Sequence, residues 1–228
     1  MDTLVNSLNE KLEVKTVFEL PIFGGVRITE SVVVTWIIMG VLLLFCFLMT
    51  RRLKVNGISK RQAFIEWVVV KLEGMIDGML GHKAKGYRWY LFTVMVFIGF
   101  ANIIGIFGFK SPTKDVNVTI ALAVMSILLV EIAGLYHLGV KKWMHKFIEP
   151  SPVVLPINIM ELVTKPLSLC MRLFGNVIGA FVIMALIELV VPVILPPVLS
   201  LYFDFFDGLL QAYVFVFLTS LYISEEVE

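Results

Sequence analysis

The chain has 228 residues, of which 59% are hydrophobic and only 16% are charged, and its mean hydropathy is +0.92. A soluble domain of this length cannot bury so much apolar surface, so the composition favours a membrane protein. The 19 Lys and Arg residues nearly balance the 18 Asp and Glu residues, which argues against a nucleic-acid partner and against an acidic disordered tail.

Residues 1–30 lack the basic start and the continuous apolar core of a removable signal peptide, so we expect this segment to be retained. Residues 31–50 contain no charged side chain, and their length as a helix matches the roughly 30 Å thickness of the hydrocarbon layer. They are predicted to form the first span. Residues 51–61 are rich in Lys and Arg, which marks the cytoplasmic side and puts the N-terminus outside.

Residues 62–80 are predicted to form a helix with its polar side chains on one face. At 100° per residue, Gln62, Glu66, Glu73 and Asp77 fall within about 60° of one another. We expect this amphipathic helix to lie on the membrane surface, beside the spans that flank it. An ordinary amphipathic helix packed in a protein core is the alternative.

The next two spans are predicted at residues 90–109 and 118–139, because both are apolar and both have basic residues at their cytoplasmic ends. The loop between them then lies outside. Three polar residues in this region have two interpretations each. Asn102 could form a packing hydrogen bond or take part in function. Asp115 and Asn117 could cap the helix that follows or lie at the mouth of a channel.

The cysteines and histidines give no sign of a metal site or of a disulfide framework. Cys46 and Cys170 both lie inside apolar stretches, where a thiol behaves as a small hydrophobic group. No Cys or His has a partner at the spacing that metal ligands require. We therefore expect no metal and no cofactor.

The last third of the chain predicts a long helical hairpin, with arms at residues 157–191 and 199–223 and a proline-rich corner at residues 192–197. The first arm would be roughly 50 Å long at helical rise, which is too long to stand upright in a bilayer. It must be strongly tilted or bent, and Pro166 predicts a local bend. The corner lies outside, which returns the C-terminus to the cytoplasm.

Arg172 is the charged residue that most needs a reason, because it lies among apolar residues in the middle of the first arm and cannot lose its proton. Polar or small residues share its helical direction to within about 40°. They are Glu161, Lys165, Ser168, Asn176 and Gly179. This stripe is either a packing face between helices or a functional face. If it meets a partner helix that bears a carboxylate, Arg172 favours the ionised form of that carboxylate.

The second arm carries Asp204, Asp207 and Gln211. On an α-helix Asp204 and Gln211 are nearly stacked, and Asp207 is about 60° away. Glu188 lies about 160° around the first arm from Arg172, so we expect it to border a different surface. Carboxylates of this kind, reached by water and tuned by burial, suit a proton entry route. The alternatives are a solvated helix start for the two aspartates and interfacial water for Glu188.

Three segments of the sequence resemble subunit a of the F-type ATP synthase, the membrane stator and ion channel of that complex. Residues 165–179 read KPLSLCMRLFGNVIG and are similar to the family's arginine helix. Residues 211–222, QAYVFVFLTSLY, are similar to its last helix. Residues 102–123 are similar to its second span, outer loop and third span. The resemblance covers most of the chain from about residue 60.

The resemblance implies an all-α polytopic membrane protein with five transmembrane helices and one membrane-lying amphipathic helix, whose last two spans form a tilted hairpin against a rotating ring of c subunits. It further implies a bacterial cell membrane, a subunit that is not catalytic by itself, and contacts with the lipid bilayer, the c-ring, the b-subunit peripheral stalk and, through the whole complex, the F1 sector. Nucleic acid is not an expected partner.

Site roles follow from the same resemblance. Arg172 would separate two aqueous half-channels and prevent ions from passing the ring without rotation. Gln211 would lie beside it, Asp204 would belong to the extracytoplasmic half-channel, and Glu161 would lie near the cytoplasmic one. Residues of the arginine stripe, Lys165, Ser168 and Asn176, complete the expected ion-translocation set.

One position departs from the family pattern. Nine residues after the arginine the family commonly has an acid or a histidine, and this chain has Phe181. Glu188 lies seven residues further, on nearly the same helical face. We hypothesise that Glu188, with Asp204 and Asp207, rebuilds the outer relay closer to the corner.

Two other functional classes stay open at this point. A secondary transporter would have inverted repeats and discontinuous helices, and the sequence has no convincing repeat. An assembly scaffold without an ion route would leave Arg172 without an obvious function, although an intramembrane acid partner could accommodate it structurally. Within the resembled family the coupling ion is expected to be the proton, and a sodium-coupled version is the alternative.

Overall fold

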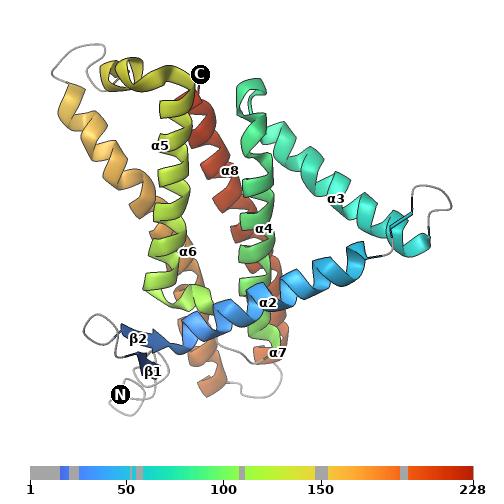
Figure 1. Cartoon of the computed structure of the whole chain (residues 1–228). Coiled ribbons are helices and arrows are strands. Elements are labelled where there is room, and N and C mark those ends of the chain that lie inside the picture. The colour runs from blue at the N-terminus through green and yellow to red at the C-terminus, as the bar shows by residue number, and fades with distance from the viewer. Residues whose placement is uncertain are drawn as a thin grey trace.

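The structure is a computed structural model that describes residues 16–20, 26–51, 53–54, 59–107, 111–146, 154–190 and 195–227. This part of the chain is almost entirely helical (Figure 1). Its strands are β1 (Thr16–Leu20) and β2 (Val26–Thr29). Its α-helices are α2 (Glu30–Thr50), α3 (Lys60–Met79), α4 (Arg88–Ile103), α5 (Val116–Lys146), α6 (Leu155–Val190), α7 (Leu195–Ser200) and α8 (Gly208–Val227). Short 3₁₀ turns cover His82–Tyr87, Ile104–Phe107 and Pro112–Lys114, and a π-helical segment covers Leu201–Asp207.

Five helical stretches of the described chain are long and apolar enough to cross a membrane, which confirms the predicted fold class of an all-α polytopic membrane protein. They are Glu30–Thr50, Ala84–Ile106, Val116–His145, Leu155–Glu188 and Val198–Val227. Long helices with few or no charges are favoured in the hydrocarbon layer because a helix satisfies all its backbone hydrogen bonds internally. The last two stretches form the expected hairpin, with α7 near the turn between its arms (Figure 1).

The N-terminal strands are a feature that the sequence did not predict. β1 and β2 pair antiparallel, with Thr16 opposite Thr29 and Leu20 opposite Val26. β2 runs directly into α2, and the hydroxyl of Thr29 donates to Asp115 Oδ2 at 3.3 Å. This bond connects the start of the first span to the loop before α5. The sequence TVFEL of β1 does not alternate between apolar and polar residues, so the pattern of a half-buried strand is absent there.

The core of the fold is a bundle in which α4, α5 and α8 run side by side and α6 packs against α5 (Figure 1). Buried residues recur at helical spacing on each member, as at Leu91, Val94 and Ile98 of α4. Phe215 of α8 is among the largest fully buried side chains. In lipid such helices are held together by close packing and by buried hydrogen bonds, such as the 2.9 Å contact between Tyr90 and Ser126.

α2 lies apart from this bundle and crosses it at a steep angle (Figure 1). It packs on α4 through Val34 and Ile38, which bury Ala101 with them. The 21 residues of α2 give a helix of about 31 Å, close to the thickness of the hydrocarbon layer. α6 has 36 residues and a length of about 54 Å. A helix of that length fits a hydrocarbon layer of roughly 30 Å only when it is strongly tilted or bent.

Glycine and proline residues account for local details of the helices α5, α6 and α7. At Gly139 the backbone of α5 has φ 75° and ψ 155°, which favours glycine, and the helix changes direction there. Pro196 lies in the first turn of α7, where its missing N–H is not needed. Pro192, part of the predicted corner, lies outside the described residues. Pro166 lies inside α6, which continues past it to Val190.

Gly208 of α8 lies directly against Asn102 of α4, and this contact provides a stability prediction. A Cβ at Gly208 would meet Asn102 Cβ at 2.7 Å, whereas a Cβ at Gly179 has nothing within 4 Å. Gly208→Ala should therefore destabilise the protein by about 1–3 kcal/mol through overpacking. Thermal unfolding of the purified chain in detergent measures the change. The matched control, Gly179→Ala, should be neutral or slightly stabilising, and equal effects of both variants would contradict the close approach.

Candidate functional site

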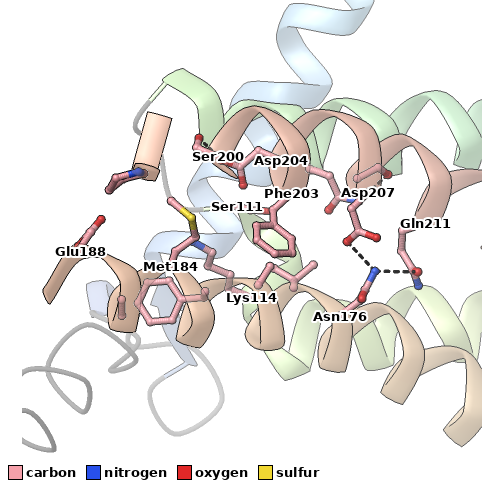
Figure 2. A pocket seen from close by; sticks show the side chains of 17 residues that line it. Ser111, Lys114, Asn176, Met184, Glu188, Ser200, Phe203, Asp204, Asp207 and Gln211 are labelled. Atoms are coloured by element: carbon pink, nitrogen blue, oxygen red, sulfur yellow. Dashed lines mark hydrogen bonds between the residues drawn. The ribbon is translucent and has the colours of Figure 1, made fainter. Parts of the chain in front are cut away.

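A cavity of about 400 Å³ lies between the two arms of the hairpin, near the corner. α6 forms one wall, and α7, the π-helical segment and the first turn of α8 form the other (Figure 2). The end of α4 and the loop before α5 contribute Asn102, Ser111 and Lys114. Its lining is about half polar, which is unusual for a space between apolar helices and makes it the first candidate for a functional site.

Three carboxylates line this cavity: Glu188 from α6, and Asp204 and Asp207 from the π-helical segment. Figure 2 shows Glu188 at one end of the cavity, Asn176 and Gln211 at the other, and the two aspartates between them. The prediction that Glu188 borders a different surface from the two aspartates is therefore wrong. The angular argument compared directions on single helices, and it could not include how the two arms face each other.

The position of Asp204 depends on a glycine of another element. Ser200 Oγ donates to Asp204 Oδ2 at 2.9 Å, one turn earlier on the same arm. A Cβ at Gly105 would lie 3.0 Å from Asp204 Oδ1, so the absence of a side chain there leaves room for the carboxylate. The wide π-helical turn carries both aspartates, where the sequence predicted ordinary α-helix. π-helical turns are frequent at functional sites, since the extra residue redirects side chains.

At the inner end of the cavity, polar side chains from the two arms of the hairpin are joined by hydrogen bonds. Asn176 Nδ2 donates to Asp207 Oδ2 at 2.7 Å and to Gln211 Oε1 at 3.4 Å. Gln211 is buried, and its Nε2 atom has no hydrogen-bond partner among the described residues. A buried amide donor without a partner is costly, and it is suited to bind an oxygen atom that comes from outside the chain.

Lys114 and Phe181 also line this cavity, and the sequence did not predict that they would lie together there. Lys114 Nζ lies 4.7 Å from the centre of the Phe181 ring, which is a cation–π distance. The cavity thus contains a cation beside its three carboxylates. The sequence predicted only that residues 110–117 form an outer loop. The turn Pro112–Lys114 packs against α6, and Ser111 Oγ connects the loop to α4 by donating to the carbonyl of Ala101 at 2.7 Å.

The three ambiguous polar residues now have defined contacts. Asn102 donates to the carbonyl of Gly208 at 3.1 Å and accepts from Thr113 at 2.7 Å, so it is a packing residue that also lines the cavity. The backbone N–H of Asn117 donates to Asp115 Oδ1 at 3.0 Å. This is the geometry of a helix N-cap, so it favours the capping interpretation for Asp115 and Asn117.

Arg172 does not line the cavity and is exposed on the outer surface of α6. Within the part of the chain that the structure describes, its guanidinium has no hydrogen bond and no ion pair. Exposed neighbours on this surface include Glu161, Ser168 and Met171. A permanent cation on the outer face of a membrane helix is costly unless a partner or water reaches it. The described part of the chain offers no such partner.

Lys165, one member of the predicted stripe, is paired within the chain. Its Nζ lies 3.4 Å from Glu226 Oε1 and 3.5 Å from Glu225 Oε2, both at the end of α8. It also lies 5.4 Å from the centre of the Tyr222 ring. The ion pair ties the far end of α8 to α6, and Gly134 of α5 leaves the space in which Glu226 is buried.

The Lys165 pair gives a second stability prediction. Glu226→Gln removes the buried carboxylate that faces a mostly buried cation, the Lys165 side chain being 13% exposed, so it should cost about 1–3 kcal/mol of stability. Glu225→Gln removes a carboxylate that is 56% exposed, and its effect should stay below about 1 kcal/mol. Thermal unfolding in detergent compares the two variants. A larger loss for Glu225→Gln would show that burial does not decide the strength of this contact.

The described residues contain no group of three His, Cys, Asp or Glu side chains that could hold a metal ion. The cavity is therefore a site built of carboxylates, amides, hydroxyls and one ammonium group. Such groups hold and pass protons or bind water.

Comparison with known proteins gives one consistent result. A sequence model of the family described as ATP synthase A chain matches residues 32–224. ATP synthase subunit a of Moorella thermoacetica is 35% identical over 206 residues, which cover 90% of this chain and 93% of the relative. ATP synthase subunit a 2 of a Bradyrhizobium species is 35% identical over 209 residues, covering 90% and 91%. The sodium ion specific subunit a of Propionigenium modestum is 32% identical over 219 residues, covering 89% and 75%.

Proposed function

The chain belongs to the ATP synthase A chain family, and from this premise we propose that it carries protons through two half-channels to the carboxylates of a rotating c-ring. As a member it is a multi-pass membrane protein and an ion-translocating subunit that is not catalytic by itself. Family membership argues against the secondary transporter and the scaffold.

The outer half-channel is the cavity between the arms of the hairpin, and this cavity is the observation that carries the proposal. A proton enters near the corner at Glu188, passes the two aspartates, and reaches the Asn176 and Gln211 end. The order of these groups in Figure 2 supports such a route. Carboxylates that exchange protons with water can serve as its steps. Phe181 forms part of the wall, and Glu188 supplies the acid that this position lacks.

Arg172 acts at the boundary of the two half-channels. Its exposure on α6, without a partner in the described chain, supports a role toward the carboxylates of the c-ring. Arginine keeps its charge at any working pH, so each ring carboxylate that passes it is held in the ionised form. The ring site must then release its proton on one side and take up a new one on the other. Protons cannot pass the stator without rotation.

The inner half-channel runs along the exposed part of the arginine stripe, with Glu161 and Ser168 as its polar residues. Lys165 contributes by position, since its ion pairs hold the end of α8 beside this stripe. In the proposed topology the N-terminus lies outside, the C-terminus lies in the cytoplasm of a bacterial cell, and α3 lies on the membrane surface. The b-subunit peripheral stalk, and through it the F1 sector, complete the set of proposed partners.

The proton is proposed over sodium because the outer cavity contains Lys114 among its carboxylates. A fixed ammonium group competes with a metal cation for the same oxygen atoms, whereas a proton is bound covalently by one of them. The relative from Propionigenium modestum carries the words sodium ion specific, so sodium remains the alternative to be tested.

The test is ATP-driven ion uptake in closed vesicles that contain the whole complex, followed with a pH dye and with radioactive sodium. Acidification that a protonophore abolishes supports the proton. Sodium uptake that resists the protonophore would reassign the coupling ion. A complex that moves neither ion would overturn the proposed function.

A further inference from the structure

A second cavity, of about 770 Å³, lies away from the ion route between the end of α2 and the start of α3. Its described lining includes three cationic side chains, those of Arg51, Lys54 and Arg61. Among its described lining residues there is no Asp or Glu. The rest of the lining includes the hydroxyl-bearing Ser59 and the apolar side chain of Leu48. The cavity therefore combines a concentrated positive charge with an apolar side.

Local contacts fix the backbone that carries these cationic residues. Gln62 is buried and joins Lys54 by two hydrogen bonds: Lys54 N–H donates to Oε1 at 3.0 Å, and Nε2 donates to the Lys54 carbonyl at 2.9 Å. Ser59 caps α3 by accepting from the backbone N–H of Arg61 at 3.3 Å. The Arg51 guanidinium lies 5.9 Å from the centre of the Phe47 ring. These contacts bring two cations from the chain before α3 and one from its first turn together.

The depth of this cavity in the membrane follows from the length of α2. Glu30–Thr50 is long and apolar enough to cross a membrane once, and the residues that follow such a span are expected at the level of the lipid headgroups. Phosphodiester groups lie at that level, and Arg and Lys bind them through charge-assisted hydrogen bonds. Leu48, which is 59% exposed, lies one turn closer to the membrane centre, where acyl chains begin.

We propose that this cavity binds an anionic phospholipid, with its phosphate on Arg51, Lys54 and Arg61 and its acyl chains along the end of α2. The apolar side distinguishes a lipid from free inorganic phosphate, which needs only the charges. Basic cavities at the ends of membrane helices are suited to anionic headgroups. The proposal does not rest on the ion route, because none of these residues lines the first cavity.

The experiment uses the whole complex in vesicles that contain a trace of photoactivatable phosphatidylglycerol. After illumination and proteolysis, the label on the peptide that joins α2 to α3 is measured by mass spectrometry as the probe is titrated. The test variant combines Arg51→Gln, Lys54→Gln and Arg61→Gln. The matched control removes three exposed cations elsewhere, by Lys71→Gln, Lys141→Gln and Lys142→Gln. Loss of three surface cations should weaken probe binding about a hundredfold in the test variant.

The expected result is saturable labelling of this peptide in the wild type and in the control, and loss of labelling in the test variant. Equal labelling of all three proteins would overturn the proposal. So would equal labelling by a photoactivatable phosphatidylcholine, since that headgroup has no net charge. Displacement of the probe by millimolar inorganic phosphate would point to a free phosphate site instead. Absence of label in the wild type, with another subunit cross-linked at this peptide, would show a protein-covered surface.

Discussion

Replacing Arg172 with alanine in the whole complex should abolish ATP-driven acidification of vesicles. The side chain is exposed and has no partner within the described part of the chain, so its removal opens no hole and breaks no internal bond. The complex should therefore assemble and hydrolyse ATP. What is lost is the cation that deprotonates passing ring carboxylates, and losing one member of a desolvated charge pair lowers coupled transport by about a hundredfold or more.

Two further variants separate this explanation from general damage to α6. Met171→Ala changes the neighbouring residue, which is 54% exposed, and should leave acidification unchanged. Arg172→Lys keeps a positive charge but loses the planar group with five donors, so transport should be reduced and not restored fully. Acidification in Arg172→Ala vesicles at more than half the wild-type rate would contradict the proposed role of this residue.

The membrane spans could be predicted from the sequence because each one is set by local composition. A helix such as Glu30–Thr50 contains an uninterrupted apolar run, and nothing in the tertiary structure is needed to recognise it. The strands β1 and β2 and the π-helical segment were missed for the opposite reason. Both are short, and a strand pair or a widened turn depends on contacts with other segments.

The candidate site was predicted residue by residue and only partly as an assembly, since the hypothesis of an outer relay had grouped Glu188 with Asp204 and Asp207. Asp204, Asp207, Gln211 and Asn176 were selected from polarity and spacing, and the structure brings them to one cavity. Helical phase describes directions around one helix axis, so it could not show that Glu188 faces the second arm. Nor could it reveal a lysine that reaches the cavity from a loop. A charged cluster that is built from several elements can be predicted only when the packing of those elements is known.

The acid at Glu188 gives the second large prediction, because it is the step of the proposed outer route nearest the corner. Glu188→Gln keeps the size of the side chain and removes its ability to exchange a proton. Coupled proton transport should fall by about tenfold to a hundredfold, since one acid–base step of a relay contributes an effect of at least that order. The initial rate of ATP-driven acidification measures it, with Leu186→Ala as a control at an exposed position outside the cavity.

Restoring a carboxylate elsewhere in the same cavity tests whether the location of the acid or only its presence matters. Phe181 lines the cavity, and Lys114 Nζ lies 4.7 Å from its ring, so a carboxylate introduced there has a cation beside it. Phe181→Glu in the Glu188→Gln background should therefore recover a substantial part of the lost transport. The single variant Phe181→Glu should remain functional, because it adds an acid to an existing route. If Glu188→Gln pumps as fast as the wild type, the outer relay does not pass through this residue.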